Sequence, residues 1–284
     1  MRKFKILTFV LLICCIFSAK VTAGDDFMVR EYMQEGYMYS QRNEHDKAIE
    51  CYNKALRIDP KRGELYLYRG MEKYDLGDFR GADKDFSSAI VLNPKNAASY
   101  YLKGSSQAAL GNYKSALNLY NTTIKLNPNV IDTYYKRGRV KMTLKDYYGA
   151  VKDYTNVINI APTYESYFYR AEARAILNDL EGAHSDYNVA LRYGDGDYTL
   201  YYDKAIVEIK LKKYNEAIKD LNEALSIDKD SADAYYFRGL EKGIKGKYKD
   251  AIKDLNKAKD LYQAKNDNKN YQKTINFLNK LSSK

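Results

Sequence analysis

The stretch Gly63–Asn96, GELYLYRGMEKYDLGDFRGADKDFSSAIVLNPKN, recurs with substitutions on both sides of itself. One alanine of this stretch returns along the chain, at Ala48, Ala82, Ala116, Ala150, Ala183, Ala217 and Ala251. The successive intervals are 34, 34, 34, 33, 34 and 34 residues. A period in this range indicates one supersecondary unit that is stacked along an axis. The chain is therefore predicted to contain seven copies of one repeat, numbered here repeat 1 to repeat 7.

Other positions of the repeat also keep one type of residue. The eighth position is small, at Gly36, Gly70, Gly104, Gly138, Ala171, Ala205 and Gly239, and the fourth is always tyrosine. Each copy has two apolar runs of helical length, such as Tyr66–Leu76 and Phe79–Leu92, which Gly77-Asp78 separates. Glycine and aspartate favour the turn, and a proline closes the first four copies because it cannot continue a helix. Two short helices bury little apolar surface, so the copies must stack side by side.

These residues resemble the tetratricopeptide repeat pattern, W-x2-L-G-x2-Y, then A-x3-F, then P. The resemblance covers residues 29–265, with tyrosine for tryptophan at position four and a basic residue for leucine at position seven. It implies an all-α, right-handed α-solenoid of about seven helix–turn–helix units. The implied units are 29–62, 63–96, 97–130, 131–163, 164–197, 198–231 and 232–265, after a lead-in at 24–28 and before a capping helix and tail at 266–284.

The N-terminal residues have the features of an export signal. Met1–Lys5 is basic, Ile6–Ala19 is apolar, and Val21–Ala23 resembles a small-residue cleavage site. We expect a signal peptide over 1–23, cleavage before Gly24, and a location that is periplasmic, envelope-associated or secreted. The alternative is an uncleaved anchor, although a spanning helix needs about 20 apolar residues and Lys20 interrupts this run.

The charge and the cysteines limit the partners. The formal charge is +10, the expected leader supplies +4 of it, and residues 241–284 carry +7, so the body of the chain is nearly neutral. We interpret the lysine-rich end as a solvated capping face, with contact to anionic lipid or cell-wall polymer as the alternative. We expect no nucleic-acid partner, because export removes the protein from most nucleic acid. Cys51 is the one cysteine after the leader, and we expect it to be a buried small hydrophobe.

No motif for catalysis or metal binding stands out in the sequence. The two histidines, His45 and His184, lie in different repeats, without a cysteine or carboxylate at metal-ligand spacing. Nucleophile elbows, phosphate-binding loops and zincin motifs are absent from the sequence. We therefore expect neither an enzyme nor a metal site, and no cofactor.

A basic residue at position seven and an aspartate 16 residues later recur together. The pairs are Arg69 with Asp85, Arg137 with Asp153, Arg170 with Asp186, Lys204 with Asp220, and Arg238 with Asp254. Because the two helices of a repeat run antiparallel, these residues are predicted to form ion pairs within each repeat. Exposed pairs contribute only ~0–1 kcal/mol each, so we expect them to fix register rather than to add stability.

In the family that the sequence resembles, the first helix of each unit lines a concave groove. The resemblance implies partner-binding side chains at position five, namely Met33, Leu67, Tyr101, Tyr135, Phe168, Tyr202 and Tyr236, with Arg139 and Glu172 at position nine. Aromatic rings are common in binding hot spots, although these rings could instead stack on one another along the groove. The residues that would clamp the C-terminal carboxylate of a chaperone are absent from the matching positions.

We expect a non-catalytic scaffold for protein–protein interaction in the cell envelope or the secreted space. Its concave groove would bind a protein or peptide segment, and the identity of that partner and the oligomeric state stay open. The alternative is a membrane-associated factor of envelope assembly, held by an uncleaved leader or by the lysine-rich C-terminus. RNA recognition would need a basic concave surface, and the groove positions have mixed charge.

Overall fold

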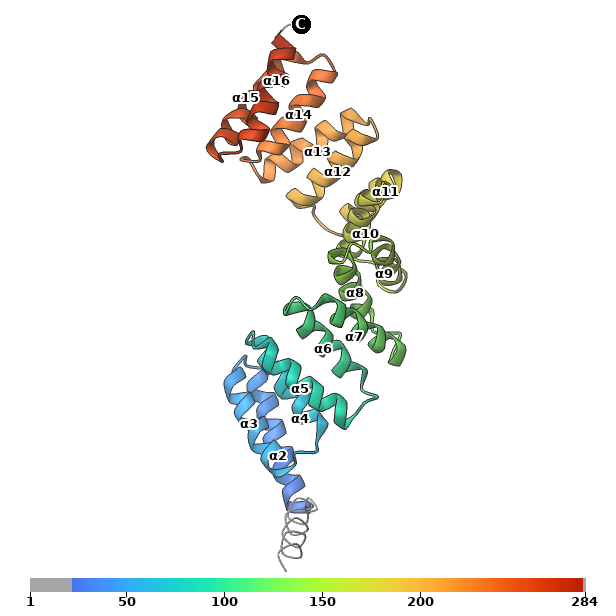
Figure 1. The fold of residues 1–284 in the computed structure, drawn as a ribbon, viewed down its shortest axis with the longest axis vertical. Coiled ribbons are helices and arrows are strands. Elements are labelled where there is room, and N and C mark those ends of the chain that lie inside the picture. The colour runs from blue at the N-terminus through green and yellow to red at the C-terminus, as the bar shows by residue number, and fades with distance from the viewer. Residues whose placement is uncertain (1–21, 283–284) are drawn as a thin grey trace, which may run out of the picture. The chain divides into compact units, whose positions relative to one another are not determined.

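The structure is a computed structural model that describes residues 22–282, and over this range it contains fifteen helices and no strand (Figure 1). The helices are α2 (Ala23–Ser40), α3 (His45–Ile58), α4 (Gly63–Asp75), α5 (Phe79–Leu92), α6 (Ala97–Ala109), α7 (Tyr113–Leu126), α8 (Ile131–Thr143), α9 (Tyr147–Ile160), α10 (Tyr164–Ile176), α11 (Leu180–Tyr193), α12 (Tyr198–Lys210), α13 (Tyr214–Ile227), α14 (Ala232–Ile244), α15 (Tyr248–Ala264) and α16 (Asn268–Ser282). The predicted all-α fold is confirmed.

The helices divide into two compact units, which we describe separately. The N-terminal unit extends to Thr133 and the C-terminal unit begins at Tyr134, within α8. In each unit the two helices of a repeat pack on each other, as α4 packs on α5 and α10 on α11. The second helix of a repeat also packs on the first helix of the next, as α5 packs on α6 and α9 on α10. The core therefore runs through successive helix pairs within each unit.

The core of each repeat lies where its two helices cross. A Cβ atom added to Gly104 would lie 2.8 Å from Cε1 of Tyr120, and one added to Gly138 would lie 2.8 Å from Cε1 of Tyr154. Both tyrosines occupy position 24 of their repeats and are at most 1% exposed. Glycine at position eight thus lets a large ring lie flat against the backbone of the neighbouring helix.

The turn inside a repeat combines a left-handed residue with an N-cap. Gly77 has a φ of 81° between α4 and α5, a value that glycine adopts without strain. Asp78 follows as the N-cap of α5, and its side chain accepts a hydrogen bond from the Gly81 amide at 2.9 Å. Asp146 and Asp179 make the same contact three residues before a glycine. This D-x-x-G motif explains why α5, α9 and α11 begin where they do.

The two ends of the described chain differ in how closely they follow the sequence prediction. Helix α2 begins at Ala23, so the predicted lead-in, residues 24–28, is helical and continuous with the first helix of repeat 1. Its N-cap is Thr22, which forms a capping box with Asp25. The predicted signal peptide lies outside the described residues except at its last two positions, Thr22 and Ala23. At the other end, α16 packs on α15 and buries Leu281. Among residues 22–282, no helix is both long enough and apolar enough to cross a membrane.

Candidate functional site

The ion pairs that the sequence predicts are present in all five repeats named above. The guanidinium of Arg170 donates from Nε to Oδ2 of Asp186 at 2.8 Å and from Nη2 to Oδ1 at 2.7 Å. Arg69, Arg137 and Arg238 make the same bidentate contact, and Lys204 reaches Asp220 at 2.7 Å. The expectation that these pairs are exposed is wrong, because the five aspartates are at most 5% exposed. Breaking such a pair leaves a buried charge uncompensated.

A second cation, at position eleven, also contacts most of these aspartates. Arg174 lies 2.7 Å from Asp186, and Lys73, Lys141 and Lys242 occupy the equivalent place in their repeats, at 2.7–2.9 Å from the aspartate. The sequence pattern could have revealed this residue, since a basic side chain occupies position eleven in four of the seven repeats. The tetratricopeptide repeat pattern has an aromatic residue at position eleven, so the resemblance did not predict a cation there.

The position-seven cation also contacts the preceding repeat. Nη1 of Arg69 donates to Oδ1 of Asn53 at 2.6 Å, and Nη1 of Arg238 donates to Oδ1 of Asn222 at 2.8 Å. Lys103, which has no aspartate in its own repeat, donates to Oγ of Ser87 at 2.8 Å. One cation therefore joins two successive hairpins, and this explains how it fixes register between repeats as well as within them.

Repeat 6 reverses the charge at position eleven. Its residue there is Glu208, which is fully buried and lies 3.5 Å from Lys204 and 3.1 Å from Nε2 of His184 in the preceding repeat. Burial, and next to it the charge of Asp220, raises the pKa of Glu208 to about 8. Burial lowers the pKa of His184, and Lys213 adds to this effect. A neutral imidazole then donates to Glu208 and accepts from Lys213, whose Nζ lies 3.3 Å from Nδ1.

The same histidine belongs to a group that the sequence spacing did not reveal. The ligand atoms of His184, Glu208 and Glu216 lie within 4.8 Å of one another, although the residues come from two repeats. Imidazole and carboxylate can bind Zn²⁺, but here the ammonium groups of Lys204 and Lys213 already lie beside them. Hydrogen bonds and charge pairing therefore explain the arrangement of these side chains.

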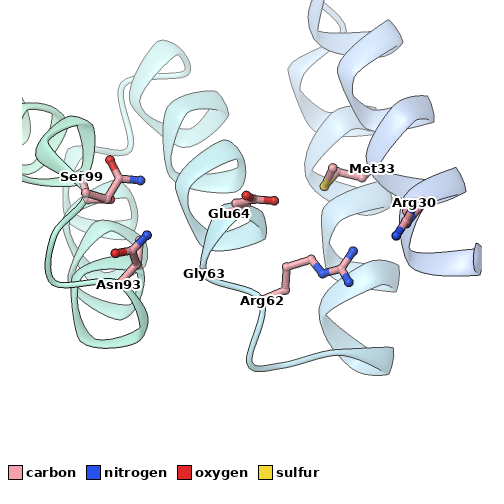
Figure 2. Close-up of a pocket in the computed structure, with 9 residues that line it drawn as sticks. Arg30, Met33, Arg62, Gly63, Glu64, Asn93 and Ser99 are labelled. Carbon is pink, nitrogen blue, oxygen red and sulfur yellow. The ribbon is translucent and has the colours of Figure 1, made fainter. Parts of the chain in front are cut away.

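In the N-terminal unit, the first predicted site residue lines a cavity of about 660 Å³. Figure 2 shows Met33 and Arg30 on α2, Arg62 and Glu64 at the start of α4, and Ser99 on α6 around this space. Arg62 is held by an ion pair with Asp26. Oγ of Ser99 is buried and has no hydrogen-bond partner among the described residues. Most side chains around the cavity are therefore polar or charged, and its apolar side chains are Met33 and Ala89.

Leu67 and Tyr101 are the other predicted site residues of this unit, and both are partly buried. Tyr101 lines a second cavity, of about 490 Å³, with Ala98, Thr123 and Val130. Its ring lies 6.1 Å from the ring of Tyr120, and its hydroxyl donates to Asp132. The Asp132 carboxylate is thus engaged within the chain.

In the C-terminal unit, Tyr135 and Phe168 are partly buried and lie in one group of rings. Tyr169 connects them, with ring centroids 5.8 Å from Tyr135 and 5.2 Å from Phe168. Beneath them, at 6.2 Å from Tyr135, lies the buried ring of Tyr154. Arg139 is exposed, and its guanidinium lies 5.9 Å from the Tyr169 ring. We call Tyr135, Phe168 and Tyr169 the ring patch.

The remaining predicted residues differ in exposure. Tyr202 is partly buried and stacks on Tyr198 at 5.6 Å. Glu172 is partly buried, and burial raises the pKa of its carboxyl. Tyr236, in contrast, is only 5% exposed and packs with Tyr262 in the core beneath α16. The structure therefore places Tyr236 in the interior and not on an open face.

Two positions of the first helix were not considered in the sequence prediction. Position six carries a ring at Tyr68 and Tyr169, and each lies 5.9 Å from the position-24 ring of the preceding repeat. Position one carries Tyr164 and Tyr198, which stack on the position-five rings Phe168 and Tyr202. The recurrence of tyrosine at position six was visible in the sequence, but only the packing of neighbouring repeats shows what it contacts.

The fold and the register of contacts define a class of protein, the helical-hairpin repeat proteins. Sequence profiles described as "tetratricopeptide repeat" or "TPR repeat" match residues 29–62, 67–131, 131–164, 206–241 and 232–265. The chain belongs to the tetratricopeptide repeat (TPR) family. No curated protein matches it in sequence. Repeats of this family form scaffolds for protein–protein interaction, and this is the class of function that the chain's repeats support.

Solved structures resemble this chain in fold. A tetratricopeptide repeat protein from Parabacteroides merdae is 21% identical, with a TM-score of 0.60, and the match covers 90% of this chain and 99% of that one. The Pseudomonas aeruginosa pilF structure is 16% identical, with a TM-score of 0.65 and coverage of 76% and 99%. YrrB, described as a TPR protein with an unusual peptide-binding site, is 19% identical, with a TM-score of 0.58 and coverage of 62% and 91%.

Proposed function

We propose that this protein is a non-catalytic scaffold that binds an extended segment of a partner protein along the first helices of its repeats. The observation that carries this proposal is the ring patch. Tyr135 and Phe168 both contact Tyr169, all three rings stay partly exposed, and each repeat already has a buried core without them. Large rings with polar tips provide contact area at a low cost in conformational entropy.

The structural relatives support a peptide as the partner by analogy. YrrB carries a peptide-binding site according to its description, and it shares the hairpin architecture of this chain. At 19% identity the likeness extends to the fold alone, so the residues that would hold the peptide come from this chain's own surface.

We further propose that the protein acts in the cell envelope or the secreted space. The support is the leader pattern of residues 1–23, with its basic start and apolar run. Cleavage before Gly24 would remove Thr22, the N-cap of α2, whereas an uncleaved leader would keep it. The competing proposal is a membrane-associated assembly factor, held by that leader or by the lysines of α15 and α16. Cell fractionation and the intact mass of the mature protein distinguish the two proposals. A soluble product that begins at Gly24 contradicts the membrane-held alternative.

The binding surface is tested with Tyr135→Ala combined with Phe168→Ala. Crosslinked pulldown from an envelope extract, followed by mass spectrometry, should show partners on the parent protein that this double variant loses. The matched control is Tyr148→Ala, because Tyr148 lies on the second helix of repeat 4 and is 77% exposed. Circular dichroism should show all proteins folded. Equal capture by the double variant and the parent would show that the ring patch does not bind the partner.

A further inference from the structure

Two carboxylates on adjacent first helices of the C-terminal unit have no positively charged partner. Glu172 lies on α10 and Asp203 on α12, and these two helices are in direct contact. Both side chains are partly buried, and neither takes part in a salt bridge or hydrogen bond within residues 22–282. Burial raises the pKa of Asp203 to about 6, and the charges of Glu172 and Asp197 add to the rise. A carboxylate that is shielded from water normally has a counter-ion or a hydrogen-bond donor, so the lack of one at both Glu172 and Asp203 needs an explanation.

Buried tyrosine side chains without hydrogen-bond partners lie at the same place. Tyr187 is 1% exposed, its hydroxyl forms no hydrogen bond within the described residues, and the charges of Asp203 and Glu172 both act on it. The hydroxyl of Tyr154 is also buried and unpartnered within the described chain, and the charge of Glu172 acts on it too.

The ring of Tyr187 lies 5.9 Å from the ring of Phe168, one helical turn before Glu172 on α10. Tyr187 also packs in one core cluster with Leu200 and Val207, which stand one turn to either side of Asp203 on α12. The two carboxylates therefore lie on the faces of α10 and α12 that cover Tyr187.

Aromatic rings flank this region on both helices. On α10, Tyr164 and Phe168 stack with centroids 5.9 Å apart and an interplanar angle of 8°. On α12, Tyr198 and Tyr202 stack at 5.6 Å and 14°. Ring faces attract cations, and Arg139 already uses Tyr169 in this way in the preceding repeats. Rings beside unpaired carboxylates form an environment suited to a cationic side chain.

Asp203 stands at position six, where neighbouring packing does not call for a charge. Tyr169, in the same position of repeat 5, packs on the position-24 ring of the preceding repeat, and Phe237, in the same position of repeat 7, packs on the core around Leu221. In repeat 6 a carboxylate faces Tyr187 instead of a ring. A ring would stabilise the stack better than a carboxylate that loses hydration. Asp203 therefore lacks the packing role that the rings of repeats 5 and 7 have at this position, and its carboxylate is left for a ligand.

We propose that Glu172, Asp203 and the Tyr187 hydroxyl form a site for a lysine or arginine side chain of the bound segment. The inference rests on the proposed function, because the same face of α10 and α12 would hold that segment. A metal ion is the poorer candidate, because among the described residues these two carboxylates belong to no group of three or more His, Cys, Asp or Glu side chains whose ligand atoms lie close together. A basic side chain would pair with the two carboxylates and lie between the flanking rings, so it accounts for each of these groups.

The test starts with random peptides displayed on phage and selected on the parent protein. Selected peptides should share one lysine or arginine. A synthetic peptide of the selected sequence should bind about tenfold or more weakly to Glu172→Gln combined with Asp203→Asn. The same loss should follow when the basic residue of the peptide becomes glutamine. The matched control is Glu223→Gln with Asp250→Asn, which removes two exposed acids from second helices and should leave affinity unchanged.

The double variant is expected to stay folded, because it removes unpaired buried charge, and its melting temperature should equal or exceed that of the parent. The inference is overturned, and the proposed function stays intact, if the selected peptides depend on Tyr135 and Phe168 but share no basic residue. Such peptides would bind equally to the Glu172→Gln, Asp203→Asn variant and to the control variant. Selection of no peptide that depends on Tyr135 and Phe168 overturns both. Mn²⁺ binding that the acid variant loses, without any preference for basic peptides, also overturns the inference in favour of a metal.

Discussion

Arg170 and Asp186, which lie 16 residues apart, face each other across one hairpin and share two parallel hydrogen bonds, at 2.7 and 2.8 Å. Arg174 adds a third charge to the same carboxylate, and Nη1 of Arg170 donates to Thr155 of the preceding repeat at 3.1 Å. A single aspartate thereby organises two helices of its own repeat and, through Arg170, a third. This arrangement gives the buried charge network a structural purpose that is independent of any partner.

Replacing Asp186 by alanine should destabilise the protein strongly. The substitution leaves Arg170 and Arg174 partly buried without their shared counter-ion, and breaking such a pair costs about 3 kcal/mol. Urea denaturation, followed by circular dichroism, measures the loss. Asp250→Ala, an exposed aspartate on α15, is the control and should change stability little. Equal stability of the two variants would show that the network contributes only register.

Replacing Glu241 by glutamine should stabilise the protein at pH 8 and not at pH 4. Glu241 is 2% exposed, Oε2 has no hydrogen-bond partner among the described residues, and burial raises the pKa to about 7. Between its ordinary pKa and 7, the unfolded chain loses this proton while the folded chain keeps it, so parent stability falls as the pH rises through that window. Because one pKa unit corresponds to ~1.4 kcal/mol, the variant should gain about 1–3 kcal/mol at pH 8.

Glu72 provides the matched control for that prediction. It occupies the same position ten of its repeat and is 3% exposed, but its Oε2 lies 2.7 Å from Nδ1 of His45. Glu72→Gln removes a partnered carboxylate, so it should lower stability at pH 8, where Glu241→Gln raises it. Denaturation midpoints of both variants at the two pH values test the contrast. A gain in both variants would mean that burial alone, and not the missing partner, sets the sign.

Gly81→Ala should reveal the D-x-x-G cap through non-additive effects. An added Cβ at Gly81 would overlap the carboxylate of Asp78, so the single variant loses the N-cap, at a cost of about 1 kcal/mol. Asp78→Ala should cost a similar amount. In the Asp78→Ala background, Gly81→Ala should instead stabilise by about 1 kcal/mol, because alanine favours the helix interior. Denaturation of the four proteins in a double-mutant cycle gives the coupling, and additive changes would contradict the cap.

Binding of a basic segment should weaken as the pH falls below about 6. Asp203 has a pKa of about 6 without a ligand, and its protonation removes one of the two charges that attract the cation. Glu172 and Asp197 are the charged groups that act on it, and a bound cation should lower its pKa because it stabilises the ionised form. Fluorescence anisotropy with a selected peptide measures the profile. Asp203→Asn should bind more weakly at pH 7.5 and lose the step near pH 6.

The sequence predicted the fold because its period is a direct consequence of the packing. The contact of Gly104 with Tyr120 and the ion pair of Arg170 with Asp186 each join the two helices of one repeat. Because equivalent contacts hold other repeats together, the same residue types return at a fixed interval. The ion pairs could be predicted for the same reason. Their burial could not, because exposure depends on the neighbouring repeat that covers Asp186, and spacing within one repeat does not show it.

The candidate site was less accessible to sequence reasoning. The rule that position five faces the groove predicted exposure for Tyr135 and Phe168, which are partly exposed, and both lie beside Tyr169. The same rule also predicted an open face for Tyr236, which is buried beneath the capping helix. Asp203 could not be found from the repeat pattern because position six varies among the repeats, with Gln34, Leu102 and Lys136 beside the three rings. His184 and Glu208 belong to different repeats, so their contact depends on how two hairpins pack and not on their spacing along the chain.

The bridging cation at position seven has an evolutionary consequence. Arg69 and Arg238 each join an aspartate in their own hairpin to an asparagine in the hairpin before it, with the same geometry. An insertion or deletion of whole repeats would therefore keep each arginine opposite its aspartate and asparagine. An insertion or deletion of any other length would leave an arginine without these acceptors. Repeat 6, whose Glu208 depends on His184 of the neighbouring hairpin, could not be duplicated or removed without its predecessor. Selection on array length would thus treat those two hairpins as one heritable block.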